Sequence, residues 1–373
     1  MFITSISNFT GLDEKLARIT GYAYMAEGAR VATARMVDQG LKPLIPSAIL
    51  KYHLTENMRQ AVTDAMDILG GKGVMSGPSN PINRAYTAIP IAITVEGAND
   101  LTRNMIIFGQ GGVRAHKHVG KILKALTEKD NVTFGLEATK LALDTTLKTL
   151  KGYTPKFMHG GGIGDVDPQS RHHYKRISKM SAKFNVLANI TYMHMQGKLK
   201  FEERSSARLG DVMSNLYLAS CALQKFENDG RPEEDRDVLN WVCQHCFYEA
   251  DKAMNEFLDN YPNKAVAAAI RAATKPMSLS IMGMDIVGMP AKPPSDQLDS
   301  KLARDIVTPG SFRDRLTDGI YKPTDPADHL SSFERAFNAK VESADLERKI
   351  KKGEIDVTAE IQAQLDAAQD LYD

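Results

Sequence analysis

The chain has 373 residues, of which 47 are Lys or Arg and 46 are Asp or Glu, so its formal net charge is +1. This balance excludes a general electrostatic attraction to nucleic acids or anionic lipids. A small-molecule substrate or a protein partner is the better expectation, and the length suffices for two or three domains.

The first third of the sequence alternates helical runs with glycine-rich turns. Apolar residues at helical intervals predict helices over residues 12–40 and 47–69, separated by a proline-containing turn. Four glycines and two prolines between residues 70 and 81 predict a loop. The uncharged run 90–95, typical of a short buried segment, precedes a helix predicted over 99–108, which Gly109, Gly111 and Gly112 should end.

The rest of the chain is also helical in pattern. We expect helices near residues 119–150, 170–197, 202–228, 235–259 and 264–273, with glycine- or proline-containing loops between some of them. Gly353, within KKGEID, suits a turn between two helices of a charged tail. Strand signals are scarce throughout, so the sequence predicts an all-α fold.

The three cysteines, Cys221, Cys243 and Cys246, are too few and too clustered for a disulfide framework, which indicates a reducing compartment. The N-terminus lacks the pattern of a secretory signal, and no run reaches the roughly 18 apolar residues of a membrane-spanning helix. We therefore expect a cytoplasmic protein whose membrane contact is at most peripheral.

Several possible ligand sites have simpler interpretations. The Cys243-Gln-His-Cys246 motif is half of a zinc site without a second half, so packing in a helix is favoured. The pairs His172-His173 and His116-Lys-His118 lack metal-binding helical spacing and should face solvent or lie in loops. The stretch HGGGIGD at 159–165 does not fit GxGxxG and is expected to be a flexible connection.

Glu96 ends the uncharged run and is followed by two small residues, Gly97 and Ala98. One interpretation is that its carboxylate caps the following helix. The other is a general base, whose proton affinity is raised by the apolar neighbours Ile93 and Val95, with space for a substrate beside Gly97 and Ala98. The residues alone leave both interpretations open.

The stretch Gly70-Gly71-Lys72-Gly73 closes a predicted helix. A glycine C-cap accounts for it. The same glycines would also let a ligand phosphate approach the backbone N–H groups without obstruction from Cβ atoms.

Taken together, several stretches resemble the C-terminal helical domain of acyl-CoA dehydrogenases, and most closely the long bacterial enzymes of fatty-acid β-oxidation. The stretches are KYH at 51–53, DAMDILGGKGVMSG at 64–77, RAY at 84–86, ITVEGANDLTRNMIIFGQG at 93–111, SARLGDVMSNLYLAS at 206–220 and YPN at 261–263. The resemblance weakens after about residue 330. It implies a C-terminal helical domain over 1–115, an additional helical domain over 116–330 and a charged tail over 331–373.

The resemblance implies that Glu96 is the base that removes the α-proton of an acyl-CoA thioester, while the β-hydride passes to FAD and trans-2-enoyl-CoA forms. The family also uses the backbone N–H of this glutamate to bind the thioester carbonyl, so Glu96 and Gly97 are expected to contact the substrate.

The family's FAD contacts correspond here to five positions: Asp67, Gly70, Gly71, Ala98 and Asp100. Common relatives carry glutamine at the first of these positions and threonine at the fourth, whereas backbone contacts at the glycines tolerate such changes.

Family members normally begin with a helical domain and a β-domain, which this sequence lacks, so we expect the C-terminal portion of a longer enzyme with little activity of its own. Acyl-CoA, an electron-transfer acceptor and copies of the same chain are the expected partners. The alternative is a non-catalytic helical scaffold for oligomerisation or docking. A third hypothesis, that the methionine-containing segment 264–292 touches a membrane surface, is less favoured than buried packing or a mobile loop.

Overall fold

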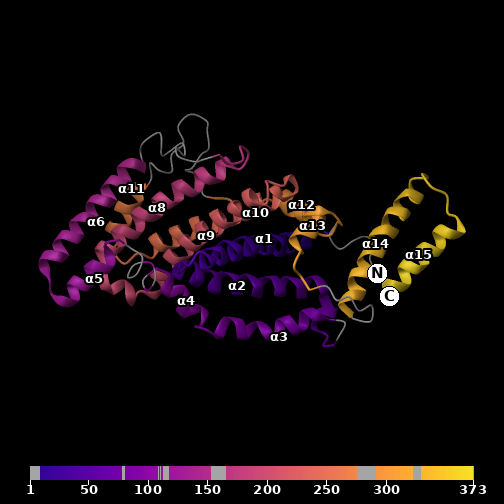
Figure 1. Cartoon of the computed structure of the whole chain (residues 1–373), viewed down its shortest axis with the longest axis horizontal. Coiled ribbons are helices and arrows are strands. Elements are labelled where there is room, and N and C mark those ends of the chain that lie inside the picture. The colour runs from indigo at the N-terminus through magenta and orange to yellow at the C-terminus, as the bar shows by residue number, and fades with distance from the viewer. Residues whose placement is uncertain are drawn as a thin grey trace. The chain divides into compact units, whose positions relative to one another are not determined.

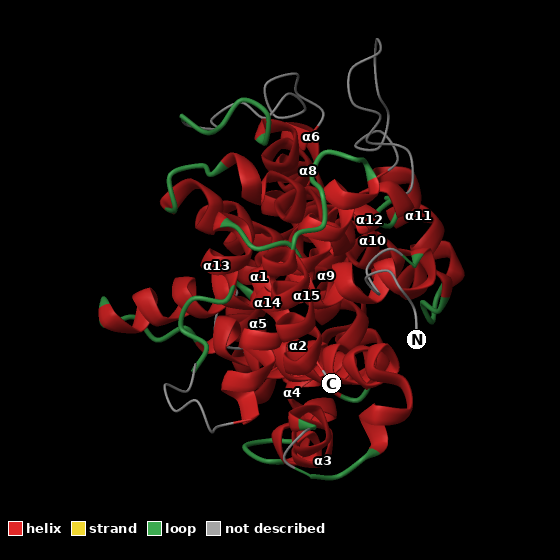
Figure 2. Ribbon diagram, turned by 90° about the vertical axis from the view of Figure 1, so that its right-hand side faces the viewer, coloured by secondary structure: helices red, strands yellow, loops and turns green. Residues whose placement is uncertain are grey.

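A computed structural model describes residues 9–77, 80–107, 109, 111, 117–152, 165–274, 291–321 and 329–372 (Figure 1). Throughout these ranges the chain consists of helices and loops without a β-strand, which confirms the all-α prediction (Figure 2). The chain divides into two compact units. The first comprises Met1–Thr20, Ala61–Ala88 and Asp296–Asp373, and the second comprises Gly21–Gln60 and Ile89–Ser295.

The N-terminal third contains α1 (Thr10–Asp38), α2 (Leu44–Leu69), the short 3-10 helix η2 (Gly70–Val74), α3 (Pro81–Thr94) and α4 (Asn99–Met105). The first two helices confirm the predictions over 12–40 and 47–69. α4 ends before residue 108 and passes into wider, π-helical turns that include Gly109 and Gly111. Those two glycines therefore do not end the helical path, and Gly112 lies outside the described residues.

Helix α3 corrects the sequence interpretation. The uncharged run 90–95, expected as a short buried segment, is the last turn of this helix and its exit, where Ile91 and Val95 are 62% and 49% exposed. Pro81 suits the first helical position, because its missing N–H would have no partner there. Pro90 lies inside the helix, where it removes one backbone hydrogen bond, and this proline obscured the helical pattern.

The second unit contains α5 (Val119–Glu128), α6 (Asn131–Gly152), α8 (Arg171–Met195), η4 (Gln196–Lys200), α9 (Glu203–Asn228), η5 (Glu233–Asp235), α10 (Arg236–Asp259) and α11 (Lys264–Thr274). The last four predicted helices are confirmed. The predicted helix 119–150 is two helices, because Asp130 caps a new start by accepting N–H bonds from Val132 (3.1 Å) and Thr133 (3.0 Å).

The core of this unit lies where α9 packs along α10, with α8 and α4 against α9 (Figure 1). Leu209, Phe226 and Val242 are fully buried there. The second half of α1 packs on the same helices. At Gly21 an added Cβ would lie 2.1 Å from the Trp241 ring, so only glycine fits this close contact.

The first unit contains α12 (Asp296–Ile306), α13 (Ser311–Leu316), α14 (His329–Lys351) and α15 (Ala359–Tyr372). α14 and α15 pack side by side as a pair of antiparallel helices (Figure 1). Gly353 has a φ of +71° in the turn between them, as predicted. Within this unit Arg18 of α1 holds Asp64 of α2 through two hydrogen bonds of 2.7 and 3.0 Å.

No helix in the described ranges is both long and apolar enough to cross a bilayer. Of the segment 264–292, residues 275–290 lie outside the described residues, so the hypothesis of membrane contact finds no support there. His116 and most of HGGGIGD also lie outside them. The division at residues 115 and 330 stays a prediction.

Candidate functional site: a strained acidic turn and an open glycine turn

Glu96 and Gly97 form a sharp turn between α3 and α4, and both have positive φ angles, +56° and +91°. A glutamate in the left-handed region is uncommon and strained, and such residues cluster at functional sites. Glycine at position 97 carries no such strain, and a Cβ there would also come within 3.3 Å of the Thr102 Oγ1 atom.

The structure excludes the capping interpretation of Glu96. The N-cap of α4 is Ala98, and no side chain caps this helix. Among the described residues, neither the carboxylate nor the backbone N–H of Glu96 makes a hydrogen bond, and the carboxylate makes no ion pair. Both groups are therefore free to meet a ligand.

The environment of Glu96 differs from the expectation of an apolar enclosure. Glu96 itself is exposed, Ile93 is part-exposed, and Val95 and Leu101 are 49% and 57% exposed. These apolar residues are neighbours of the turn in the sequence, but within the described residues they do not bury the Glu96 carboxylate. The uncharged run 90–95 suggested burial, because a sequence does not show that, among the described residues, no other helix covers the end of α3.

A buried polar cluster holds the turn from the side of α2. Asn99 is 6% exposed, and its amide donates to Thr55 Oγ1 (2.9 Å) and Glu56 Oε1 (2.7 Å). Lys51 donates to Asn99 Oδ1 (2.6 Å) and to the carbonyl of Ala92 (2.8 Å). Lys51 therefore joins the end of α3 to the start of α4 and fixes both ends of the Glu96 turn.

Arg103 anchors α4 to the core helix α9. Its guanidinium pairs with both carboxylate oxygens of Asp211, one at 2.9 Å from Nε, and lies 5.6 Å from the centre of the Tyr52 ring. Burial raises the pKa of Asp211, and the ion pair with Arg103 acts against that rise. The sequence analysis did not identify Lys51, Asn99 or Arg103 as residues of the site. The signals that could have shown them are KYH, which contains Lys51, and NDLTR, which contains Asn99 and Arg103.

The GGKG turn belongs to the first unit. Gly70 has a φ of +59° and ends α2, so the C-cap interpretation is correct. A Cβ at Gly73 would lie 2.7 Å from the carbonyl oxygen of Met66, which requires glycine there. The amide of Asn80 donates to the carbonyls of Lys72 (2.8 Å), Gly73 (2.8 Å) and Met75 (2.9 Å). This turn is firmly held.

The predicted cofactor residues differ in how well they fit a flavin. Gly70 and Gly71 are exposed, and a Cβ on either would meet nothing within 4 Å, so a ligand can approach their backbone. Ala98 and Asp100 are also exposed. Asp67 forms an ion pair of 2.5 Å with Lys15, so its carboxylate already has a partner. The glycines and Asp67 lie in the first unit, and residues 96–100 lie in the second.

The competing metal sites are structural features. Cys243 and Cys246 are completely buried, and burial raises the pKa of both thiols, which confirms the packing interpretation. Within the described residues no group of three His, Cys, Asp or Glu could hold a metal ion.

His173, expected to face solvent or lie in a loop, is buried within α8, whereas His118 lies in a turn before α5, as expected, but is also buried. His118 is 4% exposed, and its Nδ1 lies 2.8 Å from Glu137 Oε2. His173 is 3% exposed, and its Nε2–H donates to Asn240 Oδ1 at 2.8 Å. Each histidine has a polar partner on a helix distant in the sequence, which a single sequence does not reveal.

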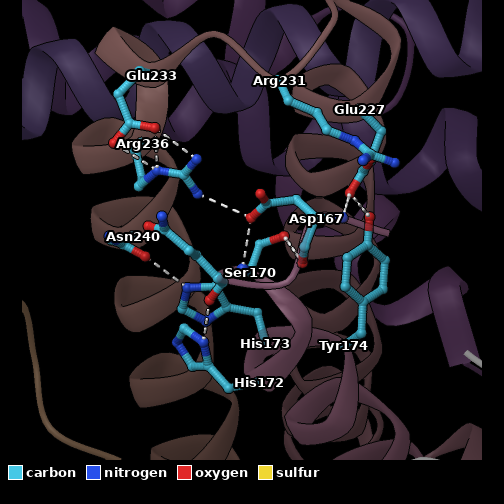
Figure 3. Close-up of polar contacts among 11 residues, drawn as sticks. Asp167, Ser170, His172, His173, Tyr174, Glu227, Arg231, Glu233, Arg236 and Asn240 are labelled. Atoms are coloured by element: carbon cyan, nitrogen blue, oxygen red, sulfur yellow. Dashed lines mark hydrogen bonds and ion pairs between the residues drawn. The ribbon is translucent and has the colours of Figure 1, made fainter. Parts of the chain in front are cut away.

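Figure 3 shows the polar cluster around His173, in which the loop before α8 is tied to α9 and α10. Asp167 accepts from the N–H of Ser170 (2.8 Å) and from Arg236 (2.9 Å). The backbone N–H of Asp167 donates to Glu227, 3.0 Å away. These partners satisfy one another, so the cluster is a structural anchor.

Two family models match the sequence of this chain. A family model described as acyl-CoA dehydrogenase, C-terminal, bacterial type, matches residues 113–371, and one described as acyl-CoA dehydrogenase, C-terminal domain, matches residues 2–109. The very long-chain specific acyl-CoA dehydrogenase of Rattus norvegicus mitochondria is 33% identical over 262 residues, covering 68% of this chain and 38% of the relative. The Mus musculus protein is 34% identical over 103 residues, or 27% and 15% of the two chains.

A crystal structure of an acyl-CoA dehydrogenase complexed with FAD, from Bacillus anthracis, is similar in fold. The TM-score is 0.59 at 18% identity, and the match covers 82% of this chain and 50% of that one. At this identity the likeness supports the fold alone. The chain spans half or less of each of these three relatives.

Proposed function

The chain belongs to the acyl-CoA dehydrogenase C-terminal family of bacterial type, and from this membership we propose that it provides the C-terminal helical domain of an FAD-dependent enzyme that converts acyl-CoA to trans-2-enoyl-CoA in fatty-acid β-oxidation. The observation that carries the proposal is the Glu96–Gly97 turn. Its acid is strained, exposed and unpaired among the described residues, and α2 holds it in place. The resemblance assigns the α-proton base to this position.

In the proposed reaction, Glu96 accepts the proton that leaves the α-carbon of the thioester. Its backbone N–H, which has no partner among the described residues, donates to the thioester carbonyl and stabilises the negative charge that develops there. The missing side chain of Gly97 leaves room beside the carboxylate. The chemistry that bound FAD would supply is acceptance of the hydride from the β-carbon, so that one proton and one hydride would leave the substrate.

We assign flavin contacts to two separate places: in the first unit, the backbone of Gly70 and Gly71, which is exposed and open, and in the second unit, the exposed residues Ala98 and Asp100. Asp67 would have to exchange its ion pair with Lys15 for a flavin contact. An electron-transfer acceptor and further copies of the chain belong to the same proposal, as does a cytoplasmic location, which the three buried free thiols favour.

To test the proposal, the chain is combined with the flavin-binding domains of a relative, either in one polypeptide or as a partner chain. The absorbance of FAD is then recorded when acyl-CoA is added. We expect bleaching with the natural sequence and at least a hundredfold slower bleaching with Glu96→Gln, which removes the base. Flavin fluorescence shows whether the variant still binds FAD.

The matched control is Glu202→Gln, because Glu202 is exposed and its side chain makes no contact among the described residues. It should bleach at the natural rate. Full bleaching by Glu96→Gln would remove Glu96 as the base. A stable oligomer that binds neither FAD nor acyl-CoA would favour the scaffold alternative.

A further inference from the structure

A cavity of about 560 Å³ lies among α8, α10 and α11, within the second unit. Its volume falls in the range of small-molecule sites, about 300–1,000 Å³. None of its residues takes part in the proposed dehydrogenase site. The cavity is lined by Lys183, Leu187, Asp251, Met254, Asn255, Leu258, Arg271, Ala272 and Thr274.

One side of the cavity is apolar. Leu187, Met254 and Leu258 are 2%, 6% and 8% exposed, and Ala272 adds a methyl group. These side chains come from all three helices, so the apolar wall is part of the packed structure. An aliphatic chain placed against it would leave water and gain hydrophobic free energy.

Among the described residues, the polar lining contains one cation that makes neither a hydrogen bond nor an ion pair. Arg271 is paired with Asp259 at 2.8 Å, and Asp251 accepts the backbone N–H of Ala291 at 3.2 Å. Lys183 makes no hydrogen bond or ion pair with any described residue. Burial lowers the pKa of its ammonium group; the charge of Asp251 opposes this, and that of Arg176 adds to it.

Lys183 is part-buried and its ammonium group has no hydrogen-bonded anion among the described residues, so an anion bound beside it would be favoured. Because one wall of the cavity is apolar, an anion that also carries a hydrophobic group fits the cavity best. Asp251 supplies one negative charge to the same cavity, so a ligand with a single negative charge fits better than a doubly charged phosphate. A carboxylate on an aliphatic chain has these properties.

We propose that this cavity binds an aliphatic carboxylate, with its head group on Lys183 and its chain along Leu187, Met254 and Leu258. This site is independent of the proposed dehydrogenase site and of flavin. Arg271 also lines the cavity, with its guanidinium paired to Asp259.

The test is calorimetric titration of the full chain with octanoate, without flavin, and with octanol as the uncharged probe of equal length. We expect saturable octanoate binding, at least tenfold weaker binding of octanol, and at least a tenfold loss with Lys183→Met. The matched control is Lys198→Met, because Lys198 is exposed and its ammonium has no described partner. No octanoate binding, or equal binding by Lys183→Met, would overturn the proposal.

A second measurement needs no variant. Octanoate should protect Lys183 from reductive methylation, measured by mass spectrometry of the peptide that carries it, and should leave the methylation of Lys198 unchanged. Equal methylation of Lys183 with and without octanoate counts against the site. Tighter binding of octyl phosphate than of octanoate would contradict the preference for a single negative charge.

Discussion

The pair of core helices, α9 and α10, and the Glu96 turn are built in opposite ways. In the helices, long runs of side chains such as Leu209, Phe226 and Val242 are fully buried. The turn exposes its acid and the apolar residues around it, and polar contacts from Lys51 and Asn99 hold it. Apolar burial stabilises the first region, whereas hydrogen bonds position the second.

Arg103 connects the two regions, because it extends from α4 at the turn to Asp211 on α9. A strained residue persists only where its surroundings hold it in place. The difference therefore suggests a division of roles: the core supplies rigidity, and the turn uses that rigidity to keep an unpaired acid in an unfavourable conformation.

The largest effect should come from the core. Phe226→Ala removes a side chain with no exposed surface and should lower the free energy of unfolding by about 3–5 kcal/mol. Leu101→Ala beside the turn, where the side chain is 57% exposed, should cost less than about 0.5 kcal/mol. Urea denaturation followed by circular dichroism measures both. Equal costs would abolish the distinction between the regions.

A smaller effect is expected from the polar cluster around His173, in which Asp167 ties the loop before α8 to the core helices. Asp167→Asn weakens the contacts with Arg236 and Ser170 and should cost about 1–3 kcal/mol at pH 7. Burial raises the pKa of Asp167, but hydrogen bonds from Arg236 and Ser170 outweigh burial and lower it.

Because the folded-state pKa of Asp167 lies below its ordinary value, its stabilising contribution is present above that value and is lost as pH falls through the folded-state pKa. Unfolding free energies measured from pH 7 down to pH 2 should therefore show the difference between the natural chain and Asp167→Asn shrinking. A difference that stays constant over this range would refute the assignment.

At the turn itself, Lys51→Met removes the donor to the carbonyl of Ala92 and to Asn99, and should cost about 1–2 kcal/mol. The local effect should be clearer than the global one, with faster hydrogen exchange at the amide of Thr102, which bonds to the carbonyl of Ala98. Lys42→Met, an exposed lysine without a described side-chain partner, is the control. Unchanged exchange at Thr102 would mean that Lys51 does not hold the turn.

The two regions also differ in what their sequences revealed. Helical periodicity predicted α9 and α10 almost to their ends, because burying one face of a helix imposes a regular apolar spacing. Helical periodicity did not predict α3 for two reasons. Pro90 interrupts the pattern, and apolar side chains such as Ile91 are exposed, so the apolar residues of this helix do not mark a single buried face. Periodicity carries information only where a face is buried.

The candidate site was predicted in part, for a related reason. Glu96 and the glycines of GGKG stand out in the sequence because an acid beside small residues and glycines that close a helix are local patterns, and the structure has a turn at each place. Lys51 and Asn99 are 48 positions apart and meet only through the packing of α2 against the turn. The exposure of Glu96 likewise depends on which helices cover it, and a local pattern does not contain that information.

The smallest effect concerns the strain itself. Glu96 has a φ of +56°, which costs a non-glycine residue about 1–2 kcal/mol, whereas glycine accepts it but loses more chain entropy on folding. Glu96→Gly should therefore raise the free energy of unfolding by about 0.5 kcal/mol. Glu96→Ala is the matched control: it removes the same carboxylate and keeps the strain, so it should not be stabilised. If Glu96→Gly is less stable than Glu96→Ala, the turn is unstrained. If it is more stable, the natural chain keeps at this turn an acid that weakens its fold, as expected where the carboxylate serves a reaction.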